Sequence, residues 1–139
     1  MVLPGLPAPH DHAGKGQNGN MLYILGGRLQ GHWNVVDTVF EYNLHSYYWS
    51  TDFATMPTSC TRCVSTTIRL GIFTAGDEGD PDTCTNVWPQ MQAYGAVRDT
   101  WTSYTDMATP AHVTAAMAYN DEITIRIGEL ETGDDTIFS

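Results

Sequence analysis

The chain has 139 residues and a formal net charge of −10, from six Lys and Arg residues against sixteen Asp and Glu residues. A field of this sign repels phosphate backbones and anionic membrane surfaces, so we expect no nucleic-acid partner and no membrane insertion. No run approaches the roughly 20 apolar residues of a spanning helix, and residues 1–20 lack the pattern of a signal peptide. The compartment stays unknown, because a leader upstream of Met1 is an open alternative.

Four short strands are expected in residues 10–53. The clearest is Met21–Gly27, a short apolar run closed by two glycines. A run that is apolar on both faces and ends in residues that free the backbone to turn is typical of a buried strand. The strand before it is expected to begin at His10–Ala13, and the strands after it to cover about Val36 to Tyr42 and Tyr47 to Phe53.

The segment Gly14-Lys-Gly-Gln-Asn-Gly19 fits the G-x-G-x-x-G string of dinucleotide sites. That fingerprint needs a strand before it and a helix after it, whereas a strand is expected to follow here. We therefore interpret the segment as the turn between the first two strands.

The same order of strands is expected to recur in the rest of the chain. The second copy covers about Arg62 to Thr67, Gly71 to Ala75, Val87 to Tyr94 and Thr100 to Tyr104. The third covers about Val113 to Tyr119, Glu122 to Ile127 and Thr136 to Phe138, so that its outer strand is missing.

Three landmarks repeat in a shared register. Tyr42 is followed after seven residues by Trp49, and Tyr94 after seven residues by Trp101, with an offset of 52 residues between the pairs. The third landmark lies 21, 20 and 21 residues before Gly27, Gly76 and Gly128, at Leu6-Pro7, Met56-Pro57 and Met107-Ala108. This register predicts an internal repeat of about 50 residues.

The pattern resembles the kelch repeat, whose period of about 50 residues corresponds to one four-stranded propeller blade. In that repeat a hydrophobic strand, a glycine pair, a Tyr and a Trp precede a turn near Met-Pro. The second copy reads Ala75-Gly76 at the glycine pair and the third reads Ile127-Gly128, whereas the first copy matches throughout. The resemblance implies an all-β, kelch-type β-propeller related to galactose oxidase, with structural repeat residues Gly26, Gly27, Tyr42, Trp49, Tyr94 and Trp101.

These repeats predict a single partial propeller domain over residues 1–139, with approximate blades at 6–56, 57–107 and 108–139, the last one incomplete. At four strands per blade this is about 2.75 blades, whereas closed rings have about four to eight. Exposed blade faces favour association. We therefore expect a homo-oligomer, a filament or the remainder of a longer propeller to complete the ring.

In kelch propellers, the loops that join the second and third strands emerge on the same face as those that join successive blades. The resemblance implies that this face binds a protein or a glycan. Trp33 is the best single anchor, and packing over the blade edge is its alternative role. The residues placed there by position are His10, Asp11, His12, Arg28, His32, Trp33, Asn34, Arg62, Asp77, Glu78, Asp80, Asp82 and His112.

No metal and no cofactor is expected at this face. Four of the five histidines fall on it, but their spacing matches no metal motif. The acidic loop Asp77–Asp82 lacks the calcium-binding pattern of the EF-hand. Neither the copper constellation of galactose oxidase nor the catalytic signature of the related sugar isomerases can be placed by motif.

The leading interpretation is therefore a non-catalytic binding or self-assembly module. A carbohydrate-active enzyme of the galactose oxidase or sugar-isomerase type is the first alternative, and a structural subunit of a repeat filament is the second. The resemblance favours an extracellular or periplasmic compartment.

Cysteine usage leaves the redox compartment open, because Cys60, Cys63 and Cys84 are too few for a disulfide framework. Cys60-Thr-Arg-Cys63 has the spacing of a redox motif, but it lies among β-branched residues that lead into a strand. A thiolate would lack the stabilisation of a helix N-terminus there. We interpret these cysteines as structural thiols or one disulfide, with redox catalysis as the alternative.

Overall fold

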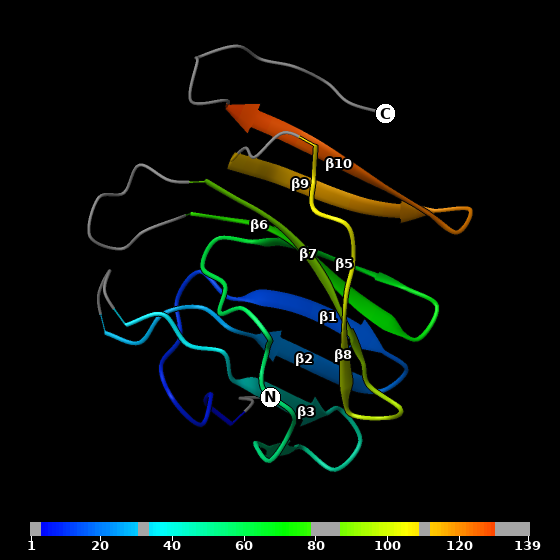
Figure 1. The fold of residues 1–139 in the computed structure, drawn as a ribbon. Coiled ribbons are helices and arrows are strands. Elements are labelled where there is room, and N and C mark those ends of the chain that lie inside the picture. Colours follow the sequence, from blue (N-terminus) through cyan, green and yellow to red (C-terminus); the bar gives the residue numbers. More distant parts are fainter. Residues whose placement is uncertain (1–3, 31–33, 79–86, 109–111, 130–139) are drawn as a thin grey trace.

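The computed structural model describes residues 4–30, 34–78, 87–108 and 112–129, which form ten strands and no helix. The strands make two four-stranded sheets and one two-stranded sheet, and all pairings are antiparallel. Figure 1 shows the sheets in chain order, with the two-stranded sheet at one end. The predicted all-β architecture of four-stranded antiparallel sheets is confirmed. The described ranges contain no helix that is long and apolar enough to cross a membrane.

The first sheet has the order β1-β2-β3-β4. Its central strand β2 carries Tyr23 and Leu25, which are both buried. The long connection from β2 to β3 contributes to the candidate binding face described below. The strands are β1 (Gly14–Asn18), β2 (Met21–Leu25), β3 (Val39–Asn43) and β4 (Tyr48–Ser50).

The interpretation of the glycine-rich segment as a turn is wrong, because Gly14–Asn18 is strand β1 itself. A Cβ atom on Gly16 would lie 2.5 Å from Cγ2 of Ile72, a residue of the second sheet. Glycine at this position lets the next sheet approach the strand closely. The first strand therefore begins at Gly14 and not at His10, and the turn follows at residues 19–20.

The second sheet repeats this order as β5-β6-β7-β8. A register shift between Ala75 and Asp77 lies at the position of the repeat glycine, Gly76. Strand β6 continues beyond Ala75 to Glu78, further than the sequence predicts. The strands are β5 (Val64–Ile68), β6 (Gly71–Glu78), β7 (Val87–Gly95) and β8 (Thr100–Ser103).

The third sheet is the hairpin of β9 (His112–Tyr119) and β10 (Glu122–Glu129). Ile123 and Ile125 lie half-buried on one face, whereas Met117 and Thr124 are exposed on the other. β9 packs against β5 and β6 of the second sheet. The strand expected at about Thr136 to Phe138 lies outside the described residues.

The core lies between the first two sheets and includes Tyr94, with Trp101 packed against it. Tyr42 pairs with Trp49 across β3 and β4, and Tyr94 pairs with Trp101 across β7 and β8. The ring centroids are 4.8 Å apart in the first pair and 5.2 Å apart in the second. Both tyrosines are buried and both tryptophans half-buried, so the seven-residue spacing corresponds to the same cross-strand pair in each sheet.

Cys60 and Cys63 form a disulfide in the segment that joins the first sheet to the second. Both residues are buried in the core cluster beside Met56 and Leu25. Of the two structural interpretations, free thiols or one disulfide, the disulfide is the one that the structure shows for Cys60 and Cys63. Cys84 lies outside the described residues.

Candidate binding face

Three segments from different parts of the chain meet at one end of the sheets. The N–H of Gly27, just after β2, donates to the carbonyl of Cys60 at 2.7 Å, and the N–H of Met56 donates to the carbonyl of Asp37 at 2.8 Å. The N–H of Arg62 donates to the carbonyl of His12 at 2.9 Å. We call the described residues of 10–13, 26–38 and 56–63 the loop face; it lies on the left in Figure 1.

The glycine pair makes this close approach possible. Gly26 and Gly27 both have positive φ angles, of 60° and 97°. A Cβ atom on Gly26 would lie 2.7 Å from the carbonyl oxygen of Cys60, and one on Gly27 would lie 2.6 Å from that of Asp11. Side chains at these positions would push the three segments apart.

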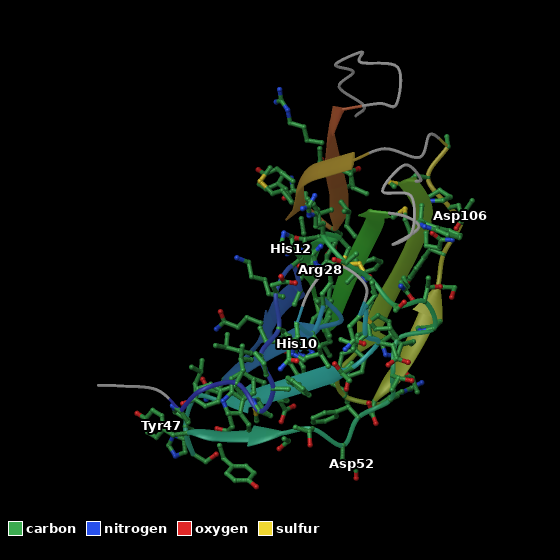
Figure 2. All side chains as sticks on the ribbon, turned by 90° about the vertical axis from the view of Figure 1, so that its left-hand side faces the viewer. His10, His12, Arg28, Tyr47, Asp52 and Asp106 are labelled. Carbon is green, nitrogen blue, oxygen red and sulfur yellow. A yellow bond between two sulfur atoms is a disulfide. The ribbon has the colours of Figure 1, made fainter. Side chains whose placement is uncertain are left out.

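Arg28 lies at the centre of the loop face and is only 5% exposed. Its Nε donates to Oδ1 of Asp11 at 2.9 Å, and its Nη2 donates to Nδ1 of His12 at 2.6 Å. The backbones of Asp11 and Arg28 also exchange two hydrogen bonds, of 3.0 and 2.9 Å. Figure 2 shows His12 and Arg28 together on this side of the molecule. Arg28 therefore ties the loop after β2 to the N-terminal segment.

The guanidinium sets the charge of this cluster. Its hydrogen bond lowers the pKa of Asp11, and this effect outweighs the opposing effect of desolvation. The carboxylate therefore stays ionised beside the buried cation, and the pair satisfies a charge that would otherwise be costly to bury.

His10 is held on the first sheet beside this cluster. Its ring lies 4.8 Å from the ring of Phe40, and its Nε2 is 3.3 Å from Oγ1 of Thr38. Burial lowers the pKa of His10, and the carboxylate of Asp11 partly opposes this shift. The neutral imidazole therefore fits this half-buried position.

No protein-family model matches the chain. A curated relative, the kelch-like protein terF of Aspergillus terreus, is 53% identical over 132 residues. The aligned region covers 95% of this chain and 29% of the relative. The sheets are kelch-type propeller blades. The chain thus spans less than a third of the kelch-like relative that it matches.

On this kelch scaffold, the structure brings together six of the predicted binding residues. Asp11, His12, Asn34 and Arg62 are exposed, His10 is half-buried and Arg28 is buried. The binding role of all of them stays a prediction. Arg28 in addition has a structural role that the sequence did not suggest.

The remaining predicted residues are not placed in the same detail. Asp77 and Glu78 close strand β6, and His112 opens β9. His32, Trp33, Asp80 and Asp82 lie outside the described residues, and so does most of the acidic loop. Among the residues that are described, no group of three or more His, Cys, Asp or Glu side chains is arranged to hold a metal ion.

Sequence reasoning missed one surface feature of these blades. A groove of about 480 Å³ lies over β6, β7 and β8, and its wall reaches Asp121 in the turn between β9 and β10. Its apolar floor includes Phe73 and Ala93, which sequence alone assigns to ordinary strand positions. The repeat register could have indicated this groove, because Phe73 in β6 is equivalent in the repeat to Tyr23 in β2.

Proposed function

We propose that this kelch-type module binds a protein partner through its loop face. The observation that carries the proposal is the buried Arg28, whose hydrogen bonds to Asp11 and His12 fix two of the three segments. Loops fixed on a rigid β scaffold hold side chains in place for recognition at little entropic cost. The fixed segments carry exposed groups of both charge signs, namely the carboxylate of Asp11 and the guanidinium of Arg62.

The charge of the chain favours a particular kind of protein surface. A net charge of −10 attracts a basic partner at long range. At contact, Arg62 and Asn34 would then donate hydrogen bonds to acceptors on that partner. A glycan ligand is the other class that the sequence predicts, and recognition of a neutral glycan would not depend on the net charge.

A comparison of two arginines tests the proposal. Arg62→Ala removes a positive charge from the loop face, and Arg98→Ala removes the same charge from the turn between β7 and β8. Both residues are exposed. Proteins captured from an extract of the source organism are quantified by mass spectrometry for the parent chain and both variants. A glycan array is run in parallel.

We expect at least one protein to be retained by the parent and by Arg98→Ala but lost by Arg62→Ala, with all three chains equally folded by circular dichroism. Equal capture by the two variants would contradict the loop face as the binding surface. Binding on the glycan array without a retained protein would instead assign the face to a carbohydrate.

A further inference from the structure

The disulfide between Cys60 and Cys63 lies where the segments of the loop face meet. The carbonyl of Cys60 accepts the N–H of Gly27 at 2.7 Å. Between the two cysteines, the N–H of Arg62 donates to the carbonyl of His12 at 2.9 Å. These hydrogen bonds reach the loop after β2 and the N-terminal segment. One covalent bond is therefore placed to control the contacts of both.

The backbone between the two cysteines has an unfavourable conformation. Arg62 has a φ angle of 56°, and its hydrogen-bonded partner His12 has one of 54°. Residues other than glycine rarely adopt left-handed φ angles, and they keep them only where the surrounding structure enforces them. The S–S bond closes a short ring that contains Arg62. Breaking this bond would let Arg62 relax and withdraw its N–H from His12.

The reduced form also has a hydrogen-bond acceptor within reach. Sγ of Cys60 lies 3.6 Å from the carbonyl oxygen of Gly76, at the register shift of β6. A disulfide sulfur has no proton to donate, whereas a thiol can donate to this oxygen. The two cysteines are only three residues apart, and a disulfide that closes so short a loop constrains the unfolded chain little. Reduction should therefore loosen this segment and leave the sheets folded.

We propose that the Cys60–Cys63 pair is a redox switch of the loop face. A thiolate of a dithiol reductant bonds to one cysteine sulfur and releases the other, which takes up a proton. The second thiol of the reductant then closes the reductant's own disulfide and releases the remaining cysteine, so two electrons and two protons pass to the pair. Oxidised glutathione reverses the reaction and leaves as two reduced glutathione molecules.

The oxidised pair fixes the loop face, and the reduced pair releases it. Disulfides persist in oxidising compartments and are reduced in the cytosol. In its effect on binding, this inference rests on the proposed function of the loop face. A partner should then be held by the oxidised chain and released when the surroundings become reducing.

The pairing is checked first, on the full chain equilibrated with oxidised glutathione. Free thiols are alkylated, and the chain is unfolded and digested with trypsin. Trypsin cuts after Arg62, between the two cysteines, so their disulfide holds peptides 29–62 and 63–69 together. Mass spectrometry before and after reduction identifies this linked pair.

Hydrogen exchange then shows what reduction changes. The amides of Gly27 and Arg62 are compared in the oxidised chain, in dithiothreitol, and after reoxidation with glutathione. The amide of Tyr104 is the control, because it donates to the carbonyl of Met91 at 2.8 Å in the second sheet. A variant with both Cys60→Ser and Cys63→Ser is measured without reductant.

We expect the amides of Gly27 and Arg62 to exchange about tenfold or more faster in the reduced chain, with Tyr104 unchanged. Reoxidation should restore the slow rates, and the double serine variant should exchange like the reduced chain. The proposal is overturned by free thiols at both cysteines in the oxidised sample, by unchanged exchange on reduction, or by an equal change at Tyr104.

These measurements need no partner, so failure of the switch and failure of the proposed function are distinguishable. For a protein whose capture depends on Arg62, we expect the reduced chain to retain about tenfold less than the oxidised chain. Equal capture by the two forms would contradict redox control of binding, although the loop face would remain the binding surface.

Discussion

The ring centroid of Tyr94 in the second sheet lies 5.7 Å from that of Tyr23 in the first, and both side chains are buried. Burial raises the pKa of Tyr94, as does the hydrogen bond to Asp99, so its hydroxyl stays protonated and donates to Oδ1 of Asp99 at 2.8 Å. The same oxygen accepts the N–H of Ala54 at 2.9 Å. Tyr94 thus joins two sheets and the segment between them.

We predict that Tyr94→Ala destabilises the chain by about 3 to 5 kcal/mol, because it removes a fully buried ring from the contact between sheets. Tyr48→Ala is the matched control, since Tyr48 is 70% exposed. Its cost should stay within about 0.5 kcal/mol. Urea unfolding followed by tryptophan fluorescence measures both. Similar losses for the two variants would show that the ring contact contributes little.

Gly16 gives a second test of how the sheets pack. Its Cβ position is blocked by three side-chain carbons of Ile72, the nearest at 2.5 Å. We predict that Gly16→Ala costs about 1 to 3 kcal/mol through overpacking. Gly5→Ala is the control, because a Cβ atom there meets no atom within 4 Å.

The second half of this test is a rescue. Ile72→Ala removes all three blocking carbons, so Gly16→Ala should cost less in the Ile72→Ala background than in the parent. A double-mutant cycle from denaturant unfolding measures the coupling. Strictly additive effects would mean that the two residues do not meet.

Much of the fold could be predicted because the residues that define each repeat lie close together in the sequence. A Tyr and a Trp seven residues apart face each other across a tight hairpin, as Tyr42 and Trp49 do. The apolar run before Gly26 likewise forms the buried strand β2. Both signals depend on side chains near one another in the sequence, which spacing reveals.

Contacts between sheets could not be predicted in this way. The glycine at position 16 looked like a turn residue because its reason, the side chain of Ile72, is far away in the sequence. Arg28 looked like an exposed loop residue, since nothing local shows that Asp11 and His12 cover it. The segments of the candidate site do meet in the structure, but the burial of Arg28 was missed, and the binding role of the site stays a prediction.

A hydroxyl of the second sheet hydrogen-bonds to the backbone of β1, the edge strand of the first sheet. Oγ of Ser65 accepts the N–H of Lys15 at 2.8 Å and donates to the carbonyl of Lys15 at 2.7 Å. We predict that Ser65→Ala costs about 0.5 to 1.5 kcal/mol and speeds hydrogen exchange at the Lys15 amide. Ser46→Ala, in the exposed turn after β3, is the control. An unchanged exchange rate at Lys15 would argue against this role.

The charge cluster of the loop face predicts how stability changes in acid. The pKa of Asp11 is lowered below its usual value of 3.8, chiefly by the hydrogen bond from Arg28. The native state therefore favours the ionised carboxylate more than the unfolded chain does. Its contribution to stability is complete above the unfolded pKa and is lost as the pH falls through the lower folded pKa.

We therefore predict that Asp11→Asn is less stable than the parent at pH 7, and that the gap narrows as the pH falls below about 4. Asp52→Asn is the matched control, because Asp52 is exposed and lies away from Arg28 in Figure 2. Urea midpoints measured between pH 7 and pH 2 give both gaps. Neutral Asn cannot hold the buried guanidinium as an ion pair, so only the Asp11 variant should show this convergence with the parent. A gap for Asp11→Asn that stays constant down to pH 2 would mean that Arg28 does not stabilise the charged form of Asp11.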